Sequence, residues 1–305
     1  MRRQYKKFSS GYRDWDQKEH AEEYMIFAEN LGEYLSIDEV SLSQGELYTF
    51  VTNKKGRGKS GSLVASIKGT LTKDIISVME MIPASERKKV KEVTLDMAKN
   101  MESAAKAIFP DCRLVTDRFH VVKLAMEALQ HIRINQRWKE LDKENAAIEE
   151  AKKHKRKYEP VVLENEDTPK QPLARCRYLL TKEPLDWTPS QKQRAALLFR
   201  EYPHLKQAYE HTMVFRNIYE QHSALVAEQR FKDWIAKTHV NEMKEFYTVA
   251  NTVNNNLHNI LNFFVNRHTN ANAESFNSKI KLFRANQRGV VDTQFFLYRL
   301  FKLFA

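Results

Sequence analysis

The sequence has few cysteines and no long hydrophobic run, and each absence excludes a class of protein. Cys112 and Cys176 are too far apart to form a metal-ligand pair or a disulfide framework, which predicts a reducing compartment. No run of about 18 apolar residues is present to span a bilayer. The basic start of the chain leads into no apolar segment and no cleavage site. We therefore expect a cytoplasmic protein with no membrane partner.

The charge balance is strongly basic. Fifty Lys and Arg face 39 Asp and Glu, which gives a net charge of +11 and an isoelectric point of about 9.4. Such a value makes a polyanionic partner a serious hypothesis. Charge alone does not establish nucleic-acid binding, because many basic proteins are merely soluble. The length of 305 residues allows one large domain or two smaller ones.

An acid lies within a strand-like stretch at residues 34–42. Leu35, Ile37 and Val40 have side chains that favour strands, so Asp38 is expected inside a sheet. An unpaired buried carboxylate is costly, and a bound cation would make it tolerable. The alternative is an edge strand in which Asp38 points to water, and this stretch alone does not decide between the two.

Further elements follow in an order that indicates a mixed sheet. Strands are expected at residues 47–52, 63–67, 90–97 and 113–116, and helices at 72–81 and 101–109. The strand at 90–97 delivers a second acid, Asp96, at its end, where ligand sites in sheets collect. Three meandering strands followed by alternating helix and strand predict an α/β protein with an RNase H-like mixed sheet and flanking helices.

The loop at residues 53–61 contains Gly-Lys-Ser, which resembles part of a phosphate-binding loop. That motif needs a glycine five positions before Gly58, where Asn53 stands, and it must lead from a strand into a helix. This loop joins two strands instead. We therefore predict a hairpin turn with its Lys and Arg on the surface.

The rest of the chain is predicted to be helical. Residues 1–34 are interpreted as a basic arm and a linker helix from about Asp16, and residues 35–123 as the first part of the core. Residues 124–267 show no strand pattern and are predicted to form a large all-helical insertion that interrupts the sheet domain. Residues 268–305 complete the core with a catalytic helix and an apolar final helix. The final helix is expected either to complete the core or to contact another subunit.

The helix expected near residues 270–288 has two distinct faces. Phe276, Ile280 and Phe283 share one face that can pack on the sheet. Glu274, Asn277 and nearby cations share another. That second face offers an acid near the helix start and positive charge further along, as a site for metal and phosphate requires. Taken alone, this helix would be an ordinary amphipathic surface helix.

The three acids together suggest metal-dependent phosphodiester chemistry. Hard oxygen ligands suit Mg²⁺ or Mn²⁺, and two such ions can activate an attacking oxygen and stabilise a leaving one. We expect Asp38 to bridge both ions, with Asp96 and Glu274 each completing one site. Asp117 is the alternative second ligand, although it can also cap the helix that follows it.

With these residues placed, the chain resembles the DDE transposases of bacterial insertion sequences, in particular the ISL-three type. The resemblance covers residues from about 35 to 289 and rests on these blocks in order: Ile37-Asp38-Glu39, Val93-Thr94-Leu95-Asp96-Met97, Phe109-Pro110, Asp117-Arg118-Phe119-His120-Val121, Arg177-Tyr178-Leu179-Leu180, Asn270 through Glu274 to Asn277, and Ile280-Lys281.

The resemblance implies DNA cleavage at element ends and strand transfer into a target, with Asp38, Asp96 and Glu274 as the triad. The expected partners are DNA and further copies of the chain, in a homodimer or larger complex on the bacterial nucleoid. His120 and Asn277 are expected next to the ligands. The expected DNA-binding residues are Lys279, Lys281, Arg284 and Arg288.

The resemblance also raises three open questions. Members of the family usually carry an N-terminal zinc-binding and helix-turn-helix region that this sequence lacks. Either the open reading frame is a fragment or a separate small protein recognises the element ends, and we favour the second. One alternative function is a catalytically inactive, transposase-derived DNA-binding protein, against which the intact acids argue. Another is an RNase H-like nuclease, which the helical insertion disfavours.

Overall fold

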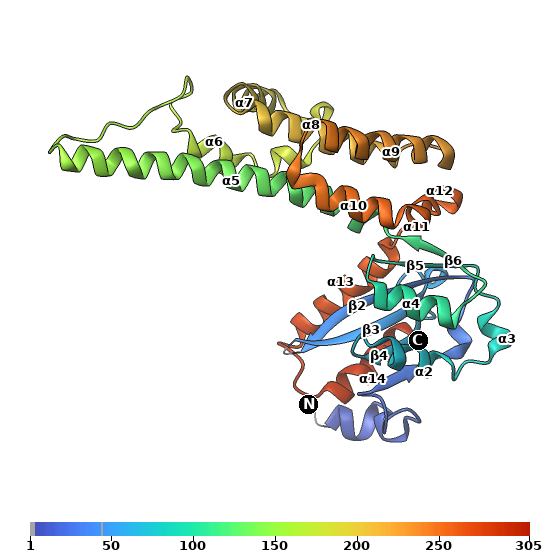
Figure 1. Ribbon diagram of the computed structural model, residues 1–305. Helices are drawn as coiled ribbons and strands as arrows, with labels where there is room; N and C mark the ends of the chain where they lie inside the picture. Colours follow the sequence, from blue (N-terminus) through green and yellow to red (C-terminus); the bar gives the residue numbers. More distant parts are fainter. Residues whose placement is uncertain (1–3, 44) are drawn as a thin grey trace. The chain divides into compact units, whose positions relative to one another are not determined.

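The computed structural model describes residues 4–43 and 45–305, and the chain divides into two units (Figure 1). The first unit comprises Met1–His120 and His258–Ala305 and is called the sheet unit here. The second, the helical unit, comprises Val121–Leu257. No helix within the described residues is long and apolar enough to cross a membrane.

The sheet unit contains a mixed sheet of six strands in the order β1-β4-β3-β2-β5-β6. Antiparallel pairing joins β1 to β4, β4 to β3 and β3 to β2, whereas β2, β5 and β6 are parallel. The α/β fold and the three-strand meander are thus as the sequence predicts. The strands are β1 (Tyr24–Ile26), β2 (Tyr34–Ser43), β3 (Glu46–Asn53), β4 (Leu63–Lys68), β5 (Glu92–Leu95) and β6 (Arg113–Thr116).

One face of the sheet is covered by α2 (Thr72–Met79) and α4 (Lys99–Ile108), with α3 (Ala84–Arg87) in the connection to β5. Leu35, Ile37, Val93 and Leu95 are buried on this face. They are mainly β-branched or aliphatic, and they alternate along β2 and β5 as one side of a pleated strand must. The helices bury the apolar stripe that their own spacing predicts.

The other face packs against α13 (Ala271–Asn286) and α14 (Thr293–Phe304). Phe276 and Ile280 of α13 are buried there, and the ring of Phe276 lies edge-on to that of Phe50 on β3, with centroids 5.5 Å apart. Six apolar side chains of α14 are also buried. The final helix therefore completes the core, which is one of its two expected roles.

The linker helix predicted in residues 1–34 is wrong. Described residues there form a short π-helix (Tyr5–Ser9), two 3-10 helices (Tyr12–Asp14 and Ala28–Asn30) and β1. Strand β1 pairs with β4, and the Gln17 side chain bonds the N–H and C=O of Ile26 at 2.8 Å each. Because pairing with β4 and with Gln17 satisfies the backbone of β1, the strand is favoured over a helix.

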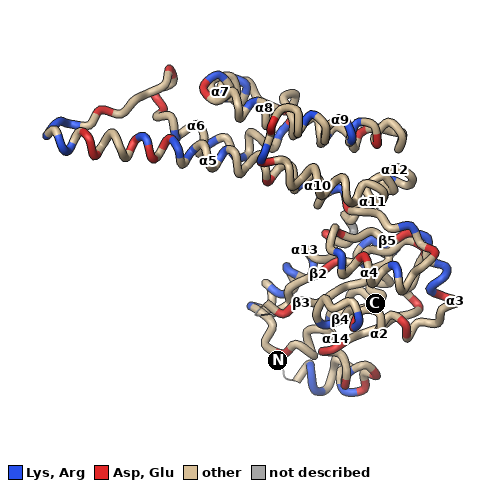
Figure 2. The backbone as a smooth tube through the Cα atoms, viewed as in Figure 1, with Lys and Arg blue, Asp and Glu red and all other residues tan. Residues whose placement is uncertain are grey.

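The helical unit contains no strand. Helix α5 (Arg118–Lys153) starts in the sheet unit and enters the helical unit, and α11 (Leu257–Leu261) and α12 (Phe263–Asn266) lead back to the sheet unit. Figure 2 shows basic and acidic residues interspersed along α5 and a basic group at its end. The lysine run at 152–157 lies at the end of α5 and just after it, and it is exposed to solvent. The remaining helices are α6 (Lys170–Arg175), α7 (Pro189–Glu201), α8 (Pro203–Ile218), α9 (Ala224–Val240) and α10 (Tyr247–Asn255).

Candidate active site

Three acids lie side by side on three adjacent parallel strands: Asp38 lies within β2, and Asp96 and Asp117 directly follow β5 and β6. Ser36 of β2 pairs with Thr94 of β5, and Leu95 of β5 pairs with Thr116 of β6. Continuing this register, Asp38, Asp96 and Asp117 occupy neighbouring positions, with strands about 4.8 Å apart. The sequence expectation of an interior strand is confirmed, because β2 lies between β3 and β5.

The alternation of side chains places these acids on the face covered by α13. Leu35 and Ile37 lie in the core on the α2 and α4 face, whereas Val40 and Leu42 lie in the core with α13 and α14. Asp38 has the same parity as Val40 and Leu42. Residues two apart on a strand share a face, so Asp38 faces α13.

Helix α13 brings two further side chains to this face. The amide Nδ2 of Asn277 donates to Oδ2 of Asp38 at 2.6 Å, and the backbone N–H of Glu39 donates to the other oxygen, Oδ1, at 2.8 Å. Glu274 lies one turn before Asn277 on the same helix. At the helix start, the backbone N–H of Asn270 donates to Oδ1 of Asp117 at 3.1 Å.

The site accumulates negative charge. Burial raises the pKa of Asp38, and the charge of Asp96 raises it further, although the hydrogen bonds from Glu39 and Asn277 and the nearby His120 oppose this shift. Burial also raises the pKa of Glu274, and the charges of Asp117 and Asp38 add to the effect. Raised carboxyl pKa values in a cluster mark a place where a cation or proton is stabilised.

Several buried polar atoms near the acids have no hydrogen-bond partner among the residues that the structure describes. They are Oε1 of Glu274, Oδ1 of Asn277, Oγ of Ser36 and both side-chain polar atoms of Asn270. Buried polar groups are nearly always paired, so unpartnered atoms in one region indicate a position for a water, ion or substrate.

Asp96 and Asp117 differ in how much of each carboxylate is already engaged. Asp117 is fully buried, and its two oxygens accept from Asn270 and from Nδ1 of His120, the latter at 2.9 Å. Asp96 is half-buried, and its Oδ1 accepts the N–H of Ala98 at 2.8 Å, near the start of α4. The expected neighbour His120 thus bonds Asp117, and this bond raises the pKa of His120.

The carboxylates are chemically suited to bind a divalent ion, but the distances between them are not those of a metal site. Carboxylate oxygens are what Mg²⁺ and Mn²⁺ prefer, and Oε1 of Glu274 is buried with no partner among the described residues. However, no three His, Cys, Asp or Glu side chains in the described part of the chain come close enough together to hold a metal ion. The hydrogen bonds above hold Asp38, Asp96 and Asp117 separately.

The four cations predicted to bind DNA have different surroundings. Nζ of Lys279 donates to the carbonyl of Gly58 at 2.6 Å, and the Arg284 guanidinium donates to the carbonyl of Ser41 at 3.4 Å. Lys281 and Arg288 are exposed. Lys279 therefore holds the loop between β3 and β4, a contact that the sequence pattern does not reveal.

A buried ionic group next to the acids was not anticipated. Lys54 was predicted on the surface, and this is wrong: it is 8% exposed, donates to Oγ1 of Thr94 and lies 3.6 Å from Oε1 of Glu92. Glu92 also accepts from Nδ1 of His268 and from Nδ2 of Asn266, each at 2.8 Å. The alternation of Glu92, Thr94 and Asp96 along β5 was the signal that could have placed Glu92 on the α13 face.

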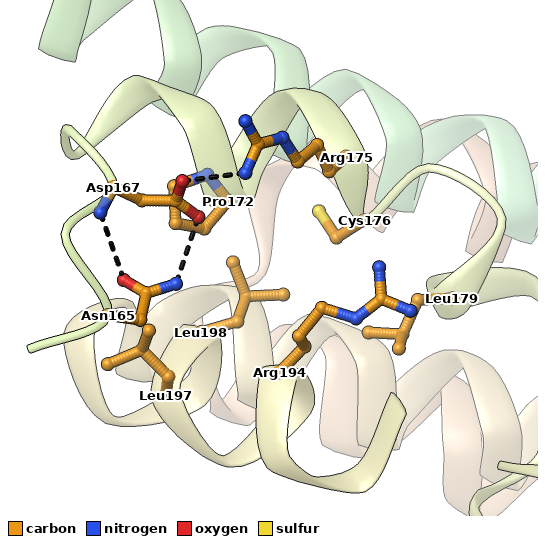
Figure 3. A pocket seen from close by; sticks show the side chains of 9 residues that line it. All are labelled: Asn165, Asp167, Pro172, Arg175, Cys176, Leu179, Arg194, Leu197 and Leu198. Atoms are coloured by element: carbon orange, nitrogen blue, oxygen red, sulfur yellow. Dashed lines mark hydrogen bonds and ion pairs between the residues drawn. The ribbon is translucent and has the colours of Figure 1, made fainter. Parts of the chain in front are cut away.

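The helical unit has a small pocket of a different kind (Figure 3). Asp167 accepts from Arg175 at 2.6 Å and from the Asn165 amide at 2.9 Å, beside the buried thiol of Cys176. Burial raises the pKa of this thiol to about 12, which makes it a poor nucleophile. The paired Asp167 and Arg175 fix the loop before α6, and the pocket shows no catalytic arrangement.

Comparison with known proteins identifies the family. A family model for DDE transposases of the ISL-three type, described as a transposase, matches residues 35–300. The chain therefore belongs to the ISL-three family of DDE transposases. No curated protein and no solved structure is similar enough to this chain to be matched.

Proposed function

We propose that this chain cleaves DNA at the ends of an insertion element and joins the freed strand to target DNA. The family supports transposition and DNA as the partner. The observation that carries the proposal is the alignment of Asp38 within β2 with Asp96 at the end of β5, on the face that α13 covers with Glu274. In this proposal the sheet unit is RNase H-like, and the helical insertion expected at residues 124–267 corresponds to the helical unit, Val121–Leu257.

Asp38, Asp96 and Glu274 are the proposed ligands of two Mg²⁺ or Mn²⁺ ions. When bound, such ions supply charge stabilisation for the attacking and leaving oxygens of the phosphodiester. Asp38 and Asp96 occupy neighbouring register positions on strands about 4.8 Å apart. Asn277 orients Asp38 through its 2.6 Å hydrogen bond.

Asp117 has a different proposed role. Its buried carboxylate fixes the start of α13 through Asn270 and orients His120, so it positions neighbours of the ligands. The half-buried Asp96 uses only one oxygen in a hydrogen bond to Ala98 among the contacts described, which supports it as the second ligand.

The larger assembly follows from the same proposal. Cleaving and joining paired ends calls for a homodimer or higher oligomer on DNA, with Lys281 and Arg288 exposed for phosphate contact. Recognition of the element ends by a separate small protein stays a prediction. We disfavour an inactive DNA-binding protein or an RNase H-like nuclease, since all three proposed ligands are present and the family is one of transposases.

The test is cleavage of labelled linear DNA that carries the ends of the element, in Mg²⁺ or Mn²⁺. Glu274→Gln should lose more than about a hundredfold in rate, since changes to outer-shell partners of a metal already cost about 10- to 100-fold. Glu80→Gln is the matched control, because Glu80 is exposed at the end of α2 on the opposite side of the sheet. Asp96→Asn should also be inactive while staying folded.

Two results would refute this assignment. One is full cleavage by Glu274→Gln. The other is an Asp96→Asn variant that still cuts DNA while a folded Asp117→Asn variant does not. The latter result would make Asp117 the second ligand.

A further inference from the structure

An open groove lies in the sheet unit beside the buried pair of Lys54 and Glu92. It encloses about 1550 Å³ including its mouth, and the residues around it come from three segments: the loop before β2, the loop after β3 and the approach to α13. Its lining includes Tyr34, Lys54, Lys55, Arg57, Arg267 and His268.

Positive charge dominates this lining. The lining contains four Lys and Arg residues but two acids, Glu29 and Glu33. Glu33 is already paired with Lys91 at 2.7 Å. Lys55 and Arg57 are exposed, and in the described part of the chain no acid lies within ion-pair distance of either. A groove with surplus cations concentrates phosphate-bearing ligands. The ring of Tyr34 adds an aromatic surface, as in grooves that hold a nucleic-acid strand.

The cationic loop, residues 53–61, is held in one conformation. Lys54 anchors its start through the buried contacts with Thr94 and Glu92. Lys279 of α13 anchors its middle through Gly58. A side chain at Gly56 would come within 2.7 Å of the Ser62 backbone, so this position accepts only glycine without a shift. These contacts fix the positions of Lys55 and Arg57 on the surface of the loop.

The lining of the groove comes close to two of the proposed catalytic acids, Glu274 along α13 and Asp96 along β5. Its lining includes His268, Thr269 and Ala271, and Glu274 follows Ala271 by three residues on α13. Three helical residues rise about 4.5 Å. At the other wall, Lys54 bonds Thr94, which stands two residues before Asp96 on the same face of β5.

The geometry points to this groove as the binding site for the phosphate backbone of the DNA strand that runs up to the cleaved bond, with Lys55 and Arg57 as the phosphate contacts. The inference rests on the proposed function and adds to it a surface apart from Lys281, Arg284 and Arg288. It also assigns the Gly-Lys-Ser loop to DNA binding and not to nucleotide binding, because the loop joins two strands and exposes cations.

The experiment measures binding of a fluorescein-labelled oligonucleotide, single-stranded and as a duplex, to the full chain in EDTA over a range of salt concentrations. The double variant Lys55→Gln, Arg57→Gln removes two charges from the groove. Lys73→Gln, Lys88→Gln removes two charges from exposed positions on α2 and after α3, on the opposite side of the sheet.

The groove variant should bind more weakly and lower the slope of log K against log salt by about 1.4 for the single strand or 1.8 for the duplex, which is two phosphate contacts. The Lys73, Lys88 variant should keep the wild-type slope. An unchanged slope in the groove variant, or an equal loss in the Lys73, Lys88 variant, would overturn the groove. Binding in EDTA does not depend on catalysis. Absence of cleavage by the wild type in Mg²⁺ or Mn²⁺ would therefore refute the proposed function and leave the binding result unchanged.

Discussion

Lys54 gives the sharpest test of the electrostatics beside the site. Burial lowers the pKa of Lys54 from 10.5 to about 8, although the nearby Glu92 and Asp117 raise it. The folded chain therefore releases this proton more readily than the unfolded chain, and the free energy of unfolding rises with pH from about 8 to 10.5. Between about pH 7 and pH 9 the gain is about 1 kcal/mol, since binding of one proton changes stability by about 1.36 kcal/mol per pH unit.

Lys54→Met should abolish this gain. Urea unfolding followed by fluorine NMR of fluorotryptophan-labelled protein measures it in the sheet unit, because Trp15 lies there and the other three tryptophans lie in the helical unit. Lys55→Met is the control, because Lys55 is exposed. Comparing variants cancels the titration of other groups. If wild type and Lys54→Met gain the same stability over this pH range, Lys54 is not buried as an ionised group and the reasoning fails.

Two other changes probe the support of the site. Asp117→Asn should lower the pKa of His120, because the hydrogen bond to Asp117 is the main cause of the raised pKa. The stability that this bond gives is present below the pKa of unfolded histidine and is lost as pH rises through the pKa of the folded state. NMR titration of the His120 ring measures the shift. An unshifted His120 would contradict the described pair. Phe276→Ala should cost about 3–5 kcal/mol in unfolding free energy, because its fully buried ring packs on Phe50 and Phe304; the exposed Leu282→Ala on the same helix should cost far less.

Much of the sheet could be predicted because its signals are local. Strand β2 with Asp38, the following two strands and the acid after β5 were readable from alternating side chains and from the breaks between them. The apolar face of α13 was readable from the spacing of Phe276 and Ile280. The family followed from blocks in a fixed order, and the family match agrees.

The first segment could not be predicted in the same way. The apolar residues near β1 recur at a spacing that also fits a helix, and the choice was made by partners far along the chain. Ile67, Ser66 and Ala65 of β4 pair with β1, and Tyr12 and Trp15 pack on α14. Local spacing carries no record of such contacts, so tertiary pairing overrode it.

The sequence by itself determined the acids, the order of the strands from β2 to β6 and the family, because residue type and periodicity are local properties. Only the tertiary structure decided what each polar group contacts. It buried Lys54 against Glu92, engaged both oxygens of Asp117 and gave Lys279 to Gly58. These partners are more than 30 residues apart in every case except His120 with Asp117. Whether a charge is buried or solvated depends on such distant neighbours, because burial without a partner is costly and the fold must supply one.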